Sequence, residues 1–222
     1  MLLLGLLNLL RSDPLAFVGL LFSLVLALVI AITIHEFTHS LVAYRLGDST
    51  AKRLGRLSPN PLVHLDPLGC LMLFVVGFGW GKPVPVNPYF LRGGARSGMA
   101  LVSLAGPISN LVVAGIFGLP LKLGLLSLGH AAAHVLVFIV FLNITLGLFN
   151  LIPIPPLDGF KVLQGILPAR YSYSLDRVGP YGPMILVAVI LVDNVAQLGL
   201  LWGALRPGLN LLGQLFLGAN LV

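Results

Sequence analysis

Long apolar stretches separated by short polar loops dominate the hydropathy pattern of the chain. The first stretch carries no charge from Pro14 through Ile34, and the helix that it predicts extends to about Tyr44. Ser97–Leu121 and Gly129–Ile152 are the next two long apolar stretches. Because about 20 apolar residues cross the hydrocarbon core of a bilayer as a helix, each stretch predicts one membrane-spanning helix.

The remaining apolar segments are interrupted by glycine and proline, and they predict shorter elements. Cys70–Val76 and Trp80–Val86 flank a glycine-containing turn, which predicts a re-entrant β-hairpin whose second strand lies at an edge because it contains two prolines. A short helix is expected from about Leu157 to Leu167, and the tail has two or three apolar stretches whose number of crossings stays open. The pattern therefore predicts an all-α polytopic membrane protein, a helical bundle of about four to six membrane segments with one short hairpin.

The composition agrees with lipid as the solvent of most of the chain. Of the 222 residues, 58% are hydrophobic and 9% are charged, and the mean hydropathy is +1.03. No polar stretch is long enough for a separate soluble module, so we expect a single membrane-embedded domain over residues 1–222. Its core would lie at 14–168 and its C-terminal membrane helices at 178–222. The single cysteine, Cys70, excludes an internal disulfide.

The basic residues predict the orientation of the chain in the membrane. There are 13 Lys and Arg against 7 acidic residues, and the basic ones lie in short loops rather than in one patch, so no nucleic-acid partner is expected. If residues 62–81 do not cross the bilayer, most of the basic residues fall on one side. This arrangement predicts a multi-pass protein of the cell membrane with a cytoplasmic loop at 45–96.

The end of the first apolar stretch contains a candidate metal site, His35-Glu36-Phe37-Thr38-His39. Residues four apart share a helix face, so His35 and His39 can bind one metal ion, and Glu36 can take a proton from a metal-bound water. Such groups are costly in hydrocarbon, which favours a functional role. Arg45 lies ten residues beyond His35. That separation places the site about 15 Å below the cytoplasmic interface and inside the membrane.

A catalytic zinc site requires a third protein ligand and one position for water. Among the other acidic residues, Asp158 is the best candidate, because it directly follows a predicted crossing and a proline-rich turn that can aim its carboxylate inward. The same position is also typical of a helix N-cap at the membrane surface. The residues alone leave both interpretations open.

The chain resembles the site-2 proteases, the intramembrane zinc metalloproteases of peptidase family M50. The resemblance rests on two specific motifs, HEFTH at 35–39 and NLIPIPPLDG at 150–159. Three further segments support it: HLDPLG at 64–69, GWGKPVPVNP at 79–88 and AGPISN at 105–110. It extends from about residue 14 to 168, and it is closest in architecture to short members of the family that lack a PDZ domain.

The resemblance implies one zinc ion per chain with three ligands, His35, His39 and Asp158. Glu36 would be the general base. Asn150 and Asn110 would hold substrate or stabilise an oxyanion, although an interhelical hydrogen bond is an alternative role for both. The hairpin would take the unwound substrate as an added strand. The substrate would be a transmembrane protein or peptide, as in regulated intramembrane proteolysis or the clearance of signal-peptide remnants, while its identity and the oligomeric state stay open.

Two other functions agree with parts of the pattern. A membrane di-iron oxygenase or desaturase uses several HxxxH boxes, and His130 and His134 form a second such pair, but this pair is expected near the opposite side of the membrane. A non-enzymatic metal-binding or transport protein would need polar residues along a continuous path across the bilayer, whereas the acidic residues gather near one interface. His64 is expected to be structural. The sequence therefore favours the protease.

Overall fold

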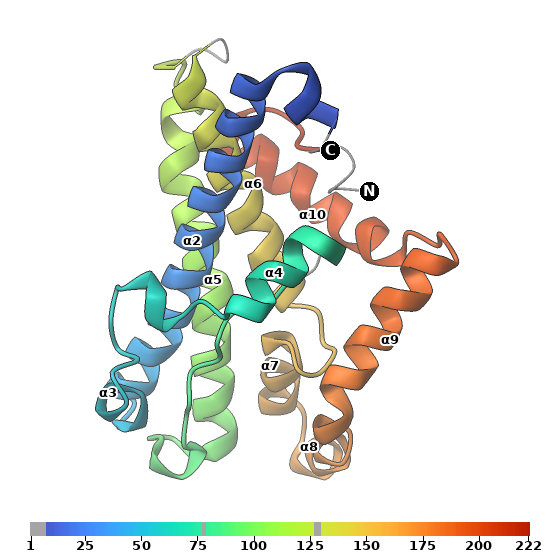
Figure 1. The fold of residues 1–222 in the computed structure, drawn as a ribbon. Coiled ribbons are helices and arrows are strands. Elements are labelled where there is room, and N and C mark those ends of the chain that lie inside the picture. Colours follow the sequence, from blue (N-terminus) through green and yellow to red (C-terminus); the bar gives the residue numbers. More distant parts are fainter. Residues whose placement is uncertain (1–7, 77–78, 127–129) are drawn as a thin grey trace.

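The structure, a computed structural model, describes residues 8–76, 79–126 and 130–222 as a bundle of helices (Figure 1). Its centre consists of three long helices that pack against one another: α2 (Pro14–Arg45), α5 (Ala95–Lys122) and α6 (Ala131–Asn150). In the described part of the chain, these three helices are long and apolar enough to cross a membrane. The three long apolar elements that the hydropathy pattern predicts are therefore confirmed as helices.

Helix α2 begins and ends where the local chemistry favours its boundaries. Asp13 caps the first turn, because its Oδ1 accepts a hydrogen bond from the N–H of Ala16 at 2.9 Å. Pro14 fills the first helical position, where no N–H donor is needed. The helix ends at Arg45, and Gly47 follows with a φ of +109°, a left-handed conformation that glycine adopts without strain.

Small side chains let the central helices approach closely. Ala31 of α2 and Ala114 of α5 are buried. Gly147 of α6 lies against α5, where an added Cβ would be only 3.2 Å from the carbonyl oxygen of Pro107. Lipid provides no hydrophobic driving force between helices, so close packing of this kind is what stabilises a membrane bundle.

The predicted β-hairpin is wrong in the described residues. The first expected strand is part of a helix, α4 (Pro67–Val76), and Trp80–Val86 forms no strand; an isolated antiparallel bridge joins Leu65 and Gly81. The turn between the expected strands includes residues 77–78, which lie outside the described ranges. Asp66 explains the helix, because its Oδ1 accepts from the N–H of Gly69 at 2.9 Å and thereby caps a first turn that opens with proline. A helix also satisfies its own backbone hydrogen bonds, which an open strand in a membrane cannot do.

The C-terminal part of the chain continues as shorter helices. Helix α7 (Asp158–Ile166) agrees with the short helix predicted after the proline-rich turn, and α8 (Ala169–Asp176), α9 (Gly182–Val195) and α10 (Leu200–Leu217) follow. Helix α8 and the segment Gly179–Val195, which includes α9, are together long and apolar enough to cross a membrane, with a bend of 43° between them. The described residues thus hold three candidate spans, or four if the bent pair counts as one, and the expected range of about four to six is not confirmed.

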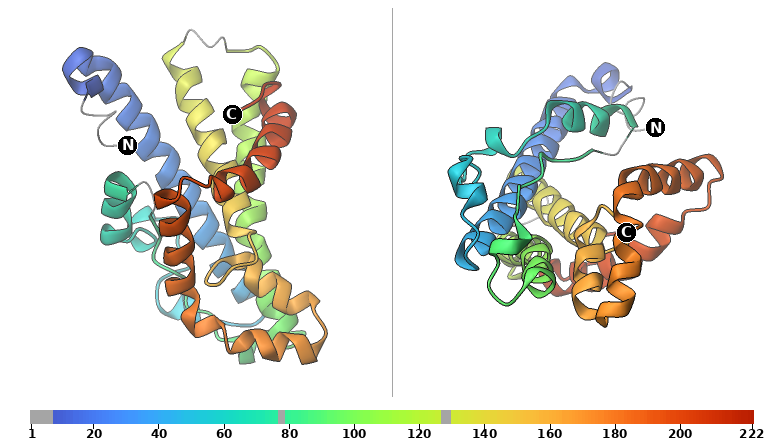
Figure 2. Two further views of the ribbon diagram at one scale, coloured as in Figure 1. Left: turned by 90° about the vertical axis from the view of Figure 1, so that its right-hand side faces the viewer. Right: turned by 90° about the horizontal axis from the view of Figure 1, so that it is seen from below.

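Several short elements complete the fold: α3 (Thr50–Arg53) and the 3-10 helices η1 (Pro61–Val63), η2 (Pro88–Phe90) and η3 (Gly179–Tyr181). The loop after α2, the start of α5 and the α7–α8 region gather at one end of the bundle (Figure 2). The end of α5 and the start of α6 lie at the other end (Figure 2). Most of the Lys and Arg residues of the chain lie in or next to the first three of these segments, which share one end of the molecule.

Candidate metal centre

Two histidines and one aspartate from distant parts of the chain meet inside the bundle. Nε2 of His35 lies 3.0 Å from Oδ2 of Asp158, and Nε2 of His39 lies 3.2 Å from the same oxygen. The three ligand atoms all lie within 4.8 Å of one another, and all three residues are buried. In the described ranges this is the only group of three or more such side chains that could hold a metal ion. The three residues that the sequence predicts as ligands are thus brought together.

The turn between α6 and α7 places Asp158 next to His35 and His39. Helix α6 ends at Asn150, and α7 begins at Asp158 itself, with Leu157 at the N-cap. The carboxylate contacts the two histidines. Gly159 allows the start of α7 to pack closely against the end of α6, because an added Cβ would lie 2.2 Å from the carbonyl oxygen of Leu151. These contacts favour the ligand interpretation of Asp158 over that of a surface N-cap.

The second ring nitrogen of each histidine is bound to an acceptor. Nδ1 of His35 lies 2.6 Å from Oδ1 of Asn110, and Nδ1 of His39 lies 2.7 Å from the carbonyl oxygen of Val102. Because neither oxygen can donate, each Nδ1 carries the proton, and in the neutral form of each ring the lone pair of Nε2 would face Asp158. Two lone pairs and a carboxylate oxygen that converge on one point suit a cation. The residues therefore fit a zinc ion, whose histidine ligands are oriented in this way by hydrogen bonds to the other nitrogen.

Asn110 belongs to a buried polar network that joins the three central helices. Its Nδ2 donates to the carbonyl oxygen of Ala31 in α2 at 3.0 Å and to Oδ1 of Asn143 in α6 at 2.9 Å. Asn143 in turn donates to the carbonyl oxygen of Ile139 at 2.8 Å. Sequence reasoning selected Asn110 but missed Asn143, whose signal is an amide within a mainly apolar part of α6.

Gly106 is a second residue that sequence reasoning did not single out. An added Cβ there would lie 2.5 Å from Nε2 of His39 and 2.7 Å from Cε1 of His35. The backbone of α5 therefore lies directly against both imidazole rings, and only glycine leaves them room. The AGPISN segment contained the signal, but its spacing alone does not reveal which ring the glycine faces.

The other predicted residues lie in different surroundings. The carboxylate of Glu36 is half-buried, and its Oε2 accepts from the N–H of Val84 at 3.2 Å. Asn150 donates to the carbonyl oxygen of Leu146 in its own helix at 2.9 Å, so its described contact is not with the cluster. His64 is buried, and its Nε2 contacts the carbonyl oxygen of Ser58 at 2.7 Å, which agrees with a structural role.

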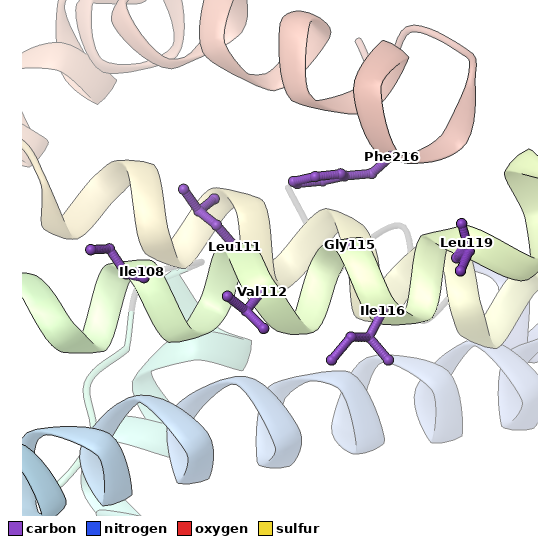
Figure 3. Close-up of a pocket in the computed structure, with 7 residues that line it drawn as sticks. All are labelled: Ile108, Leu111, Val112, Gly115, Ile116, Leu119 and Phe216. Carbon is purple, nitrogen blue, oxygen red and sulfur yellow. The ribbon is translucent and has the colours of Figure 1, made fainter.

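An open apolar groove of about 460 Å³ lies along α5 beneath a phenylalanine of α10 (Figure 3). Its lining consists of Ile108, Leu111, Val112, Gly115, Ile116, Leu119 and Phe216. None of these side chains can bind a metal, donate a proton or pair with a charge. The groove therefore adds no chemistry to the metal centre, and an apolar surface of this kind is what lipid tails contact in a membrane.

An HExxH pair buried on a candidate membrane span, with an aspartate from a second helix, defines the class of an intramembrane metalloprotease. The model of peptidase family M50 matches residues 125–192. YwhC of Bacillus subtilis (strain 168) is 40% identical over 202 residues, which cover 87% of this chain and 90% of YwhC. The chain belongs to peptidase family M50, and it is an intramembrane zinc metalloprotease.

More distant relatives agree with this assignment. Rip2 of Mycolicibacterium smegmatis is 32% identical over 189 residues, which cover 80% of this chain and 70% of Rip2. The zinc metalloprotease MJ0392 of Methanocaldococcus jannaschii is 30% identical over 152 residues, which cover 68% of this chain and 36% of that protein. YwhC and Rip2 are provisionally named zinc metalloproteases. No solved structure gives a significant match.

Proposed function

We propose that this chain hydrolyses a peptide bond within or near a transmembrane segment of a membrane-protein substrate, with His35, His39 and Asp158 as the ligands of one zinc ion. The observation that carries the proposal is the convergence of the two Nε2 atoms on the Asp158 carboxylate, while each Nδ1 is held by an acceptor. When bound, zinc supplies a Lewis acid that lowers the pKa of a water molecule and polarises the scissile carbonyl.

Glu36 is the general base in this proposal. It directly follows a ligand on the same helix, and it is the only glutamate of the chain. The N–H of Val84 occupies Oε2 at 3.2 Å, which leaves Oε1 to accept a proton from water and to return it to the leaving amine. A transmembrane helix covers its peptide bonds with its own hydrogen bonds, so the substrate must unwind locally before it reaches this site.

The two asparagines have different roles in this mechanism. Asn110 orients His35 through Nδ1, because its amide is fully engaged with α2 and α6. Asn150 keeps the role that the family resemblance implies, a contact with the substrate backbone or with the developing oxyanion. Its Nδ2 has one proton bound within its own helix and a second proton to offer.

The proposed setting is the cell membrane, with the basic end of the bundle in the cytoplasm. The clustering of the basic segments at one end supports this orientation (Figure 2). The partners are the bilayer and a transmembrane protein or peptide, and residues 1–222 act as one membrane-embedded domain. The total number of crossings, about four to six including the C-terminal helices, belongs to the same proposal. Reporter fusions within 45–96 should give a cytoplasmic signal, and an external signal there would reverse the topology.

Elemental mass spectrometry of detergent-purified protein tests the ligand set. We expect about one zinc per chain in the wild type, and loss of zinc in both His35→Ala and Asp158→Ala. Glu36→Gln should retain the metal and lose cleavage of a transmembrane substrate; turnover by this variant would exclude the general-base role. Iron in place of zinc would support an oxygenase, although His130 and His134 do not belong to the described cluster.

A further inference from the structure

The segment that contacts Glu36 has no secondary structure of its own. Residues 82–84 form neither helix nor strand, and a single bond from the N–H of Lys82 to the carbonyl oxygen of His64, at 2.8 Å, is their described backbone link to the preceding loop. The N–H of Val84 nevertheless lies 3.2 Å from Oε2 of Glu36. Because no helix or sheet fixes this position, side chains must hold the segment against α2.

Arg56 provides that attachment. Its guanidinium donates to the carbonyl oxygens of Lys82 and Pro83, the second at 3.2 Å, and to the carbonyl oxygen of Val63 in the preceding loop. The residue is only 7% exposed. One side chain thus joins two loops immediately beside the residue that contacts Glu36.

The backbone of Arg56 is fixed to the same helix that carries Glu36. Oγ of Ser40 donates to the carbonyl oxygen of Arg56 at 3.1 Å, and it also lies 3.1 Å from the carbonyl oxygen of Glu36. The N–H of Arg56 donates to the carbonyl oxygen of Ala51 at 2.8 Å. A chain of hydrogen bonds therefore begins at Ser40 in α2, one turn after Glu36, and continues through Arg56 to residues 82–84. It ends at the Glu36 carboxylate, which accepts from the N–H of Val84.

The hydrogen bonds that Arg56 makes in this chain require an arginine side chain. A guanidinium presents five N–H donors in a rigid plane and can reach several carbonyls at once, whereas a lysine ammonium is a point charge on a flexible stem. Among the described ion pairs none involves Arg56, so the carbonyl groups stabilise its buried charge at close range, and the negative charge of Glu36 acts on it from farther away. A buried arginine held in this way has the fixed geometry that a positioning role requires.

We propose that Arg56 is a positioning residue of the peptidase reaction: it holds residues 82–84 so that the Val84 N–H fixes the orientation of the Glu36 carboxylate. This inference rests on the proposed function of Glu36 as the general base. Arg56 itself touches neither a zinc ligand nor the reacting atoms. A misplacement of a catalytic group by about 1 Å can cost about 100-fold in rate, so loss of Arg56 is expected to lower kcat by about 10- to 100-fold.

A double-mutant cycle with Val84 tests the proposal. Arg56→Gln removes the attachment, and Val84→Pro removes the N–H that contacts Glu36, while Val84→Ala keeps it. If both act through the same bond, the double variant loses no more kcat than the more damaging single variant, and the zinc content stays at about one per chain in all. Arg53→Ala is the matched control, because this nearby exposed arginine contacts Ser49 and Thr50 and not residues 82–84.

Hydrogen exchange gives a readout that does not depend on turnover. In Arg56→Gln we expect faster exchange in a peptide that covers residues 82–86, with unchanged exchange in α5 and α6; Arg56→Lys should lie between this variant and the wild type. Unchanged exchange at 82–86, or losses of kcat that multiply in the double variant, would overturn the proposal. Failure of the proposed function would be seen in a different experiment. Cleavage by Glu36→Gln would show that Glu36 is not the general base, whatever the Arg56 variants do.

Discussion

Oδ1 of Asn110 lies 2.6 Å from Nδ1 of His35, so a residue of α5 determines which nitrogen of a histidine in α2 can bind metal. An amide oxygen accepts hydrogen bonds only, and it therefore fixes the proton on Nδ1. Asn110 is held in turn by Ala31 and Asn143. The tautomer of His35 thus depends on the packing of three helices.

Asn110→Ala should weaken zinc binding by about 10- to 100-fold, because the ring of His35 loses the partner that orients it. Competition with a zinc chelator measures this affinity. Ser109→Ala is a suitable control, since among the described residues the Ser109 hydroxyl donates to the carbonyl oxygen of Gly106 in its own helix, at 2.7 Å, and not to His35. Equal zinc affinity in the two variants would contradict the orienting role.

Gly106→Ala should displace the histidines although alanine is the better helix former by about 1 kcal/mol. Its Cβ would lie 2.5 Å from Nε2 of His39, a distance that forces either the ring or α5 to move. We expect most of the bound zinc to be lost, as measured by elemental analysis. Gly115→Ala in the same helix is the comparison, because its Cβ would meet the Phe216 ring at 3.4 Å and lies away from the cluster. Full zinc content in Gly106→Ala would show that the helices can separate at low cost.

Asp158→Asn should lower zinc affinity while the fold is retained. The substitution keeps the shape of the side chain but leaves two neutral imidazoles and an amide, without the anionic oxygen that a divalent cation favours. Zinc competition gives the affinity, and circular dichroism gives the helix content. An unchanged affinity would mean that another group completes the site.

Asp48 is expected to make stability depend on pH. Burial on its own raises the pKa of this carboxyl, but hydrogen bonds from Thr50 and Asn87 and the charge of Arg53 outweigh burial, so the pKa lies below its usual value. A lowered pKa in the folded state stabilises the protein above the unfolded pKa of about 3.9, and this contribution is lost as the pH falls through the folded value.

Thermal unfolding in detergent between pH 7 and pH 3 measures this contribution. At pH 7, Asp48→Asn should lower the free energy of unfolding by about 1–3 kcal/mol, because the partly buried N–H groups of Thr50 and Asn87 each lose a charged acceptor. The difference between the two proteins should shrink below about pH 4. A difference that stays constant with pH would exclude Asp48 as its source.

The features that could be predicted from the sequence are those that depend on the pattern of neighbouring residues. Helix α2, the HExxH face and the bend before Asp158 follow from apolar length, from a spacing of four residues and from proline chemistry, all of which are contained in short stretches of sequence. Gly106, Asn143 and Arg56 were missed because their importance arises from partners more than 15 residues away in the chain. The hairpin prediction is wrong for a related reason: the glycines after Val76 favour a turn, but Asp66 and Pro67 form a capped helix start before them.

Of the three proposed zinc ligands, Asp158 lies 119 positions after His39 and 123 after His35, and both histidines contact α5 through their Nδ1 atoms. During synthesis, a chain that has inserted α2 and α5 carries oriented histidines but no carboxylate, and so it cannot yet hold the metal as the finished protein does. With this ligand set, we expect metal loading to be a late step of biogenesis that follows the packing of α7 into the bundle. A protease that shares its membrane with many newly inserted helices would in this way stay inert until its own assembly is complete.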